Sequence, residues 1–143
     1  WREDGTRDNW GAFCYIRDLT DGNLWSNAHQ PALGEPKQYE AIFSQARAEF
    51  RRRDADFETY TEIAVSPEDD MELRRIRATN RSRVRKTVEF TSYAEVVLLN
   101  PIADELHTAF NNLFVQTEIL RPQEAIMCTR RSRSGKENPY GEF

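Results

Sequence analysis

The chain of 143 residues has little cysteine and no long apolar segment. Its two cysteines, Cys14 and Cys128, are too few for a disulfide framework, and neither lies in a metal-ligand spacing. Both fall inside strand patterns, so we expect buried free thiols rather than a bridge. No apolar run approaches the roughly 20 residues of a membrane-spanning helix. We therefore expect no membrane contact by this segment.

An excess of positive charge is also missing. The net charge is -4, with 20 Lys and Arg against 24 Asp and Glu. A general nucleic-acid-binding protein needs a clustered positive field, so nucleic acid is not expected as a partner. The basic cluster between Arg74 and Lys86 follows an acidic run from Glu68 to Glu72. We interpret both as a solvated, cross-paired outer face.

Histidine is rare as well, and His29 and His107 have no nearby Cys or His in the sequence. We therefore expect no metal site and no cofactor. Aromatic residues, in contrast, are plentiful, with eight Phe, five Tyr and three Trp. A chain of this size can bury about 68 to 70% of its unfolded surface, enough for one core. The sequence thus predicts a single domain over 1–143.

Hydrophobic periodicity is that of strands rather than helices. Alternating segments at 12–18, 24–26, 39–45, 47–53 and 57–65 are separated by turn residues. In the strand predicted at 57–65, one face is expected to be buried and the other exposed to solvent. About nine short strands, with turns every eight to twelve residues, predict an all-β antiparallel sandwich.

The second half of the chain carries more specific expectations. We predict one long hairpin over 71–98, with a β-bulge at Arg74-Arg75 that keeps Met71, Leu73 and Ile76 on the core side. Because Val96 to Leu99 is apolar on both faces, its second strand is expected to run to Leu99 and to be central. One short helix is predicted near 102–110, followed by strands at 113–120 and 125–130 around a four-residue turn.

Several sequence segments resemble those of a known protein family. They are WREDGTRDNWGAFCYIRD (1–18), GNLWS (22–26), YEAIFS (39–44), AVSPEDDMELRRIRATNRS (64–82), TSYAEVVL (91–98) and FNNLFVQTEI (110–119). These segments resemble the β-sandwich module of bacterial cyclic β-1,2-glucan synthases. That module is of the same type as the amino-terminal domains of glycoside hydrolase family 94, formerly called glycosyltransferase family 36. The resemblance covers nearly the whole chain.

The resemblance implies a supersandwich like that of galactose mutarotase, incomplete within 143 residues. An incomplete sandwich is expected to present an open strand edge and to self-associate through it. The parent would make glucan from UDP-glucose on the cytoplasmic side of the bacterial inner membrane, with phosphorolytic control of length. The family's general acid lies in a separate (α/α)₆ barrel, an expected partner. We therefore expect no catalytic residue and an inactive fragment.

Aromatic and planar polar residues near the start are the candidate site. Sugar rings stack on aromatic side chains, and their hydroxyls need polar partners. We expect Trp10, Arg17, Asp18 and Trp25 to border a carbohydrate or interdomain surface, with β-1,2-glucan as the carbohydrate that the resemblance implies. Core filling is the competing interpretation for Tyr15 and Trp25.

Three functions are compatible with these observations. The favoured one is a noncatalytic module of a glucan synthase that acts as a scaffold or glucan contact. The second is a free-standing carbohydrate-binding protein. The third is an epimerase that would use His29 and His107, as sugar mutarotases use histidine with a carboxylate.

Overall fold

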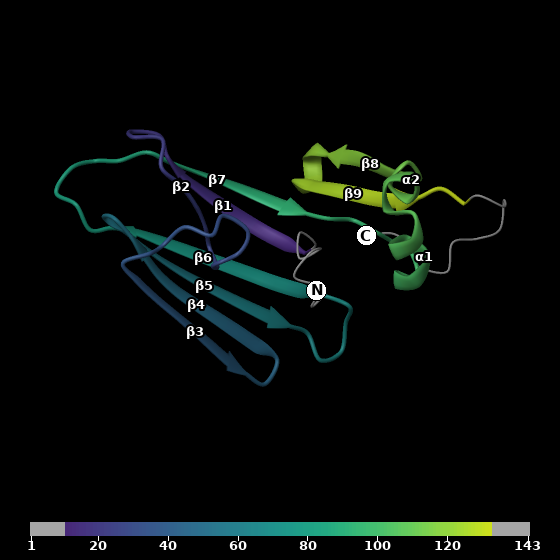
Figure 1. Cartoon of the computed structure of the whole chain (residues 1–143), viewed down its shortest axis with the longest axis horizontal. Helices are drawn as coiled ribbons and strands as arrows, with labels where there is room; N and C mark the ends of the chain where they lie inside the picture. The colour runs from purple at the N-terminus through teal and green to yellow at the C-terminus, as the bar shows by residue number, and fades with distance from the viewer. Residues whose placement is uncertain (1–10, 133–143) are drawn as a thin grey trace. The chain divides into compact units, whose positions relative to one another are not determined.

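The computed structural model describes residues 11–132. The chain divides into two compact units, residues 1–94 and 95–143. Figure 1 labels the helices and strands of both.

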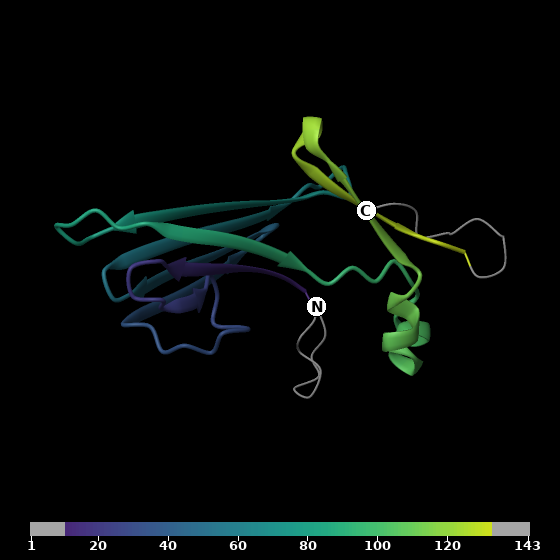
Figure 2. The same cartoon turned by 90° about the horizontal axis from the view of Figure 1, so that it is seen from above.

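The first unit is an antiparallel β-sandwich of two sheets. One sheet has the order β2-β1-β7 and the other the order β3-β4-β5-β6. In both views the strands of the two sheets run in similar directions, as in aligned sheet packing (Figures 1 and 2). This arrangement confirms the predicted all-β sandwich. The strands are β1 (Ala12–Asp18), β2 (Leu24–Ser26), β3 (Gln38–Ser44), β4 (Arg47–Asp54), β5 (Phe57–Val65), β6 (Glu72–Asn80) and β7 (Val88–Ala94).

The core lies between these two sheets. Ile16 is fully buried, and Trp25 and Phe57 are 5% and 4% exposed, with ring centroids 5.7 Å apart. Ile76 and Val88 pack against this cluster from β6 and β7. From Phe57 to Glu62 the buried residues of β5 alternate with half-buried ones, which confirms the predicted one-sided burial there. The last residues differ from the prediction, because Ile63 is half-buried and Val65 is 52% exposed.

The predicted hairpin over 71–98 is wrong. β6 pairs with β5, whereas β7 pairs with β1 in the other sheet. The connecting segment is held from both sides: the Arg81 backbone N–H donates to the Asp56 carbonyl, and Lys86 pairs with Asp18. The chain therefore crosses between the layers where a reversal within one sheet was expected.

The predicted bulge at Arg74-Arg75 is also wrong. The register between β5 and β6 runs unbroken from Phe57 opposite Asn80 to Val65 opposite Glu72. Leu73 stays outside, 64% exposed, so no inserted residue is needed to bring it to the core. Arg74 instead reaches across the sandwich, where its Nη1 donates to the Ala12 carbonyl.

The strand predicted to continue to Leu99 is shorter than expected. β7 ends at Ala94, and Leu98 has a positive φ of 48°, which no regular strand residue adopts. Among the described residues β7 pairs only with β1, so it is an edge strand and not a central one. Phe90 is accordingly 46% exposed.

The second unit contains helices α1 (Pro101–Leu106) and α2 (Thr108–Asn112), strands β8 (Val115–Leu120) and β9 (Ala125–Arg130), and a 3₁₀ turn, η1 (Arg121–Gln123). The Asn100 side chain accepts a hydrogen bond from the Ile102 N–H and caps α1. The helical region at 102–110 is thus confirmed as two short helices that meet at His107. β8 and β9 form the predicted hairpin.

Two further expectations concern cysteine and the membrane. Cys14 and Cys128 are buried and free, as predicted. Burial raises the pKa of the Cys14 thiol. None of the helices described in residues 11–132 has the length and the apolar composition of a membrane span.

Candidate functional site

Of the four predicted surface residues, the structure describes Arg17, Asp18 and Trp25, and these three do not share one surface. Trp10 lies outside the described residues. Asp18 and Trp25 are buried, whereas Arg17 is exposed. Strand alternation explains the split, because neighbours in β1 point to opposite faces of their sheet. Trp25 fills the core, which was the competing interpretation for this residue.

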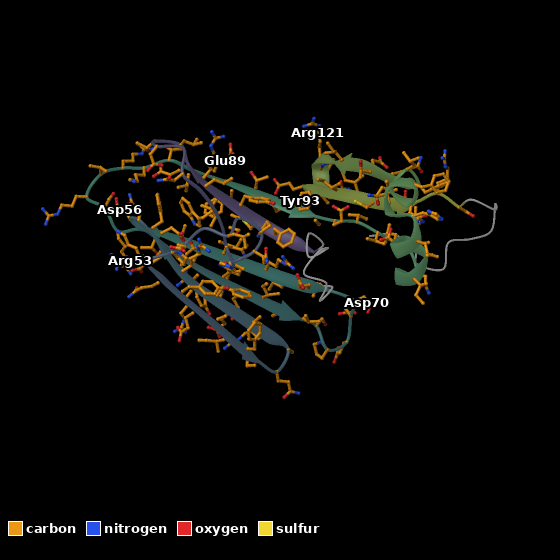
Figure 3. All side chains as sticks on the ribbon, viewed as in Figure 1. Arg53, Asp56, Asp70, Glu89, Tyr93 and Arg121 are labelled. Carbon is orange, nitrogen blue, oxygen red and sulfur yellow. The ribbon has the colours of Figure 1, made fainter. Side chains whose placement is uncertain are left out.

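Arg17 lies on the outer face of the three-stranded sheet. There it lines a hollow of about 470 Å³ together with Tyr15, Gly22, Leu24, Glu89 and Thr91. Figure 3 shows Glu89 on β7 along this layer. A carbohydrate or interdomain contact at Arg17 therefore stays a prediction.

Asp18 forms a buried ion pair with Lys86. The Lys86 ammonium lies 2.9 Å from Asp18 Oδ2. The Lys86 side chain is 13% exposed and the Asp18 side chain 3%. The Thr20 N–H donates to the other carboxylate oxygen at 2.9 Å. The hydrogen bond from Lys86, followed by that from Thr20, lowers the pKa of Asp18, and the same pair raises the pKa of Lys86. Asp18 thus joins the end of β1 to the crossover before β7.

The pair predicts a pH-dependent contribution to stability. Because the folded pKa of Asp18 is depressed, its contribution is present at neutral pH and disappears as the pH falls through the folded pKa. Urea unfolding of wild type and Asp18→Asn is expected to show a clear difference in unfolding free energy at pH 7, which shrinks between about pH 5 and pH 2. A difference that stays constant over this range would contradict the assignment.

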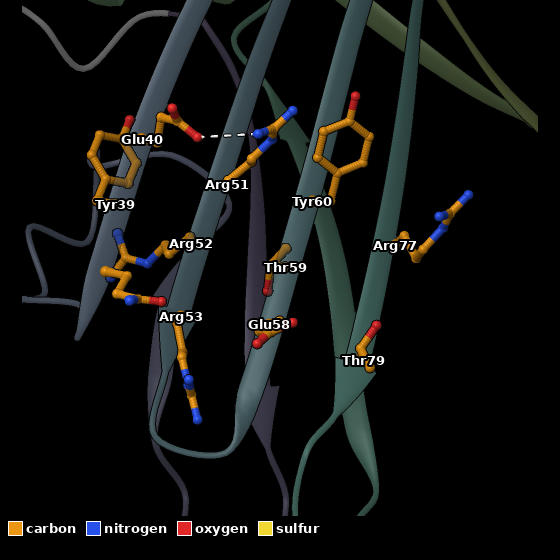
Figure 4. A pocket seen from close by; sticks show the side chains of 11 residues that line it. Tyr39, Glu40, Arg51, Arg52, Arg53, Glu58, Thr59, Tyr60, Arg77 and Thr79 are labelled. Atoms are coloured by element: carbon orange, nitrogen blue, oxygen red, sulfur yellow. Dashed lines mark hydrogen bonds and ion pairs between the residues drawn. The ribbon is translucent and has the colours of Figure 1, made fainter.

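A second hollow, lined mainly by polar side chains, lies on the four-stranded sheet. It has a volume of about 690 Å³ and receives side chains from β3, β4, β5 and β6 (Figure 4). We call its outward-facing part the Tyr60 face. This face consists of Gln38, Glu40, Arg51, Arg53, Glu58, Tyr60, Arg77 and Thr79.

Strand register builds the Tyr60 face as two rows. In the first row, Glu40 lies opposite Arg51, Arg51 opposite Tyr60, and Tyr60 opposite Arg77. In the second row Gln38, Arg53, Glu58 and Thr79 follow each other across the same strands. The rows are two residues apart along each strand, so all eight side chains point to one side.

Tyr60 is the aromatic centre of this face and is held at its hydroxyl. Tyr60 Oη donates to Glu49 Oε2 at 2.9 Å, and the Arg51 guanidinium lies 5.9 Å from the ring centroid. The hydrogen bond to Glu49 raises the pKa of Tyr60. Glu49 is only 6% exposed and is paired with Arg47 at 2.6 Å. The ring therefore has a fixed position.

Some charged groups of the Tyr60 face form ion pairs and others do not. Arg51 pairs with Glu40 at 3.3 Å, and both side chains are more than half exposed. Arg81 pairs with Glu58 at 2.6 Å, and this hydrogen bond lowers the pKa of Glu58. Within residues 11–132, neither Arg53 nor Arg77 forms an ion pair. Two guanidinium groups are thus available for a ligand.

Another hollow of about 590 Å³ is lined largely by apolar residues, among them Phe13, Phe43, Phe50 and Ile63. His29 borders it, with its ring 6.4 Å from that of Tyr39. His107 belongs to the other unit. In the described part of the chain, no three His, Cys, Asp or Glu side chains converge as they would around a metal ion.

The layered sheets and the polar outer face define an antiparallel β-sandwich module. The chain belongs to the family of glycosyl hydrolase 94 supersandwich domains, whose model matches residues 1–143. It is also similar to a protein named cyclic beta-(1,2)-glucan synthase NdvB from Rhizobium meliloti (strain 1021), with 34% identity over 134 residues. The match covers 94% of this chain and 5% of that protein.

Proposed function

We propose that the chain is a noncatalytic β-sandwich module of a larger enzyme that makes β-1,2-glucan, serving as a scaffold and glucan contact. One observation carries the proposal: a named glucan synthase contains a segment similar to 94% of this chain, and that segment is only 5% of the synthase. The proposal includes a parent at the cytoplasmic side of the inner membrane and packing of this module on an (α/α)₆ barrel.

The chemistry of the Tyr60 face supports a binding role over a catalytic one. A glycosidic general acid needs a carboxyl group whose pKa is raised by its surroundings. Glu58 has the opposite environment, since Arg81 lowers its pKa. Glu40 and Glu49 are likewise paired with arginine. The Glu58 carboxylate therefore suits fixed hydrogen bonding better than proton transfer.

The proposal predicts that the purified chain turns over no saccharide. β-1,2-Glucan would be incubated with the chain and inorganic phosphate, and separately with UDP-glucose, and the products followed by chromatography. We expect the glucan length and the UDP-glucose concentration to remain those of the enzyme-free control. Release of glucose 1-phosphate or UDP above that control would overturn the proposal.

A further inference from the structure

We propose that the Tyr60 face is the surface on which this module holds glucan, as a short neutral segment laid across β3 to β6. The inference rests on the proposed function and adds the place and the mode of contact. It moves the contact from the outer face of the three-stranded sheet, where Arg17 lies, to that of the four-stranded sheet.

The dimensions of the face fit an oligosaccharide. Neighbouring strands lie about 4.8 Å apart, so a row of four side chains spans about 14 Å. The hollow of about 690 Å³ falls in the range of ordinary ligand sites. Arg51 and Glu40 at one end of the first row have side chains 55% and 58% exposed, so a ligand can reach them.

The Tyr60 ring supplies the apolar platform. A sugar presents C–H groups on the face of its ring, and an aromatic side chain buries them favourably. The Tyr60 hydroxyl is anchored by Glu49 and its ring is flanked by Arg51, so little conformational freedom remains to be lost on binding. Figure 4 shows Arg51, Tyr60 and Arg77 on three successive strands.

The polar groups around the ring match sugar hydroxyls. Arg53 and Arg77 offer guanidinium N–H donors that no ion pair occupies among the described residues. Thr79 adds a hydroxyl and Gln38 an amide, each able to donate and accept.

The arrangement of charge favours a neutral ligand over an anionic one. Glu40 and Glu58 lie directly opposite Arg51 and Arg53 in the strand register. A polyanion needs a continuous positive field, which these interleaved carboxylates interrupt. A neutral sugar chain can use both signs, because each hydroxyl donates and accepts.

The test is calorimetric titration of the 143-residue chain with linear β-1,2-linked gluco-oligosaccharides. Tyr60→Ala and Arg77→Ala are each expected to weaken binding about tenfold. Tyr60→Phe, which keeps the ring, should stay within about threefold of wild type. Arg17→Ala tests the rival contact predicted on the other sheet and should bind like wild type. Raising the salt concentration should leave the affinity unchanged.

Other outcomes overturn the inference. If Arg17→Ala weakens binding and Arg77→Ala does not, the glucan contact lies on the three-stranded sheet and the noncatalytic module proposal survives. Absence of glucan binding, or salt-sensitive binding of an acidic polymer in place of glucan, also removes the Tyr60 face as a glucan site.

Arg77 is exposed, so its variant keeps the test valid even if Tyr60→Ala unfolds. Turnover of glucan by wild type would instead remove the proposed function.

Discussion

Replacement of Arg52 by methionine is expected to lower the free energy of unfolding by about 3–5 kcal/mol. The Arg52 side chain is fully buried, and its guanidinium group donates hydrogen bonds to four acceptor atoms. It pairs with Asp54 at 2.6 and 2.9 Å and donates to the Ala28 and Gly34 carbonyls at 3.1 Å each. Methionine fills similar space but leaves the Asp54 carboxylate and two carbonyl groups without this donor.

Chemical denaturation of the two proteins measures this effect. Arg51→Met is the matched control, because Arg51 is the preceding residue of β4 and its side chain is 55% exposed. Arg51 pairs with Glu40 at 3.3 Å and with Glu49 at 3.5 Å, and because its guanidinium group is exposed these pairs should contribute at most about 1 kcal/mol. Ala28 and Gly34 lie in the loop between β2 and β3. Equal destabilisation by both substitutions would show that the Arg52 hydrogen bonds do not stabilise this loop.

Replacement of Trp25 by alanine has a similar expected cost, about 3–5 kcal/mol. The indole is 5% exposed and packs against Phe57 at the centre of the sandwich, so its loss leaves a cavity between the sheets. Trp25 Nε1 has no hydrogen-bond partner in residues 11–132. Trp25→Phe should therefore cost less, since it removes volume without breaking a hydrogen bond.

Urea unfolding curves of Trp25→Ala, Trp25→Phe and Leu24→Ala give the comparison. Leu24 is the neighbouring residue and is 56% exposed, so its truncation should change stability by no more than about 0.5 kcal/mol. A loss at Trp25→Ala as small as that at Leu24→Ala would contradict the assignment of Trp25 to the core, and would favour its role in the predicted sugar surface.

The local patterns of the sequence predicted the strands well where burial is one-sided. Phe57 to Glu62 alternates because its inner residues face the other sheet, and the observed burial follows that alternation until Ile63, which is half-buried, and Val65, which is exposed. The path from Asn80 to Val88 could not be predicted in this way. Its crossover depends on distant partners, Asp18 for Lys86 and Asp56 for Arg81, that no local spacing reveals.

The site was harder to predict because aromatic content alone does not separate a core residue from a sugar platform. Trp25 and Asp18 were chosen for their chemistry, yet both are buried. The Tyr60 face did leave a signal in the sequence: the residues that alternate with the buried face of β5 are Glu58, Tyr60 and Glu62. Only the strand register shows which arginines lie opposite them.

A nuclear magnetic resonance titration of the isotopically labelled chain with β-1,2-linked gluco-oligosaccharides tests the central claim most directly. The account predicts that the amide signals of Arg51, Tyr60 and Arg77 move with added ligand, that the signal of Arg17 does not, and that no new sugar species forms. Shifts confined to the strand carrying Arg17, or the appearance of new sugar signals, would contradict it.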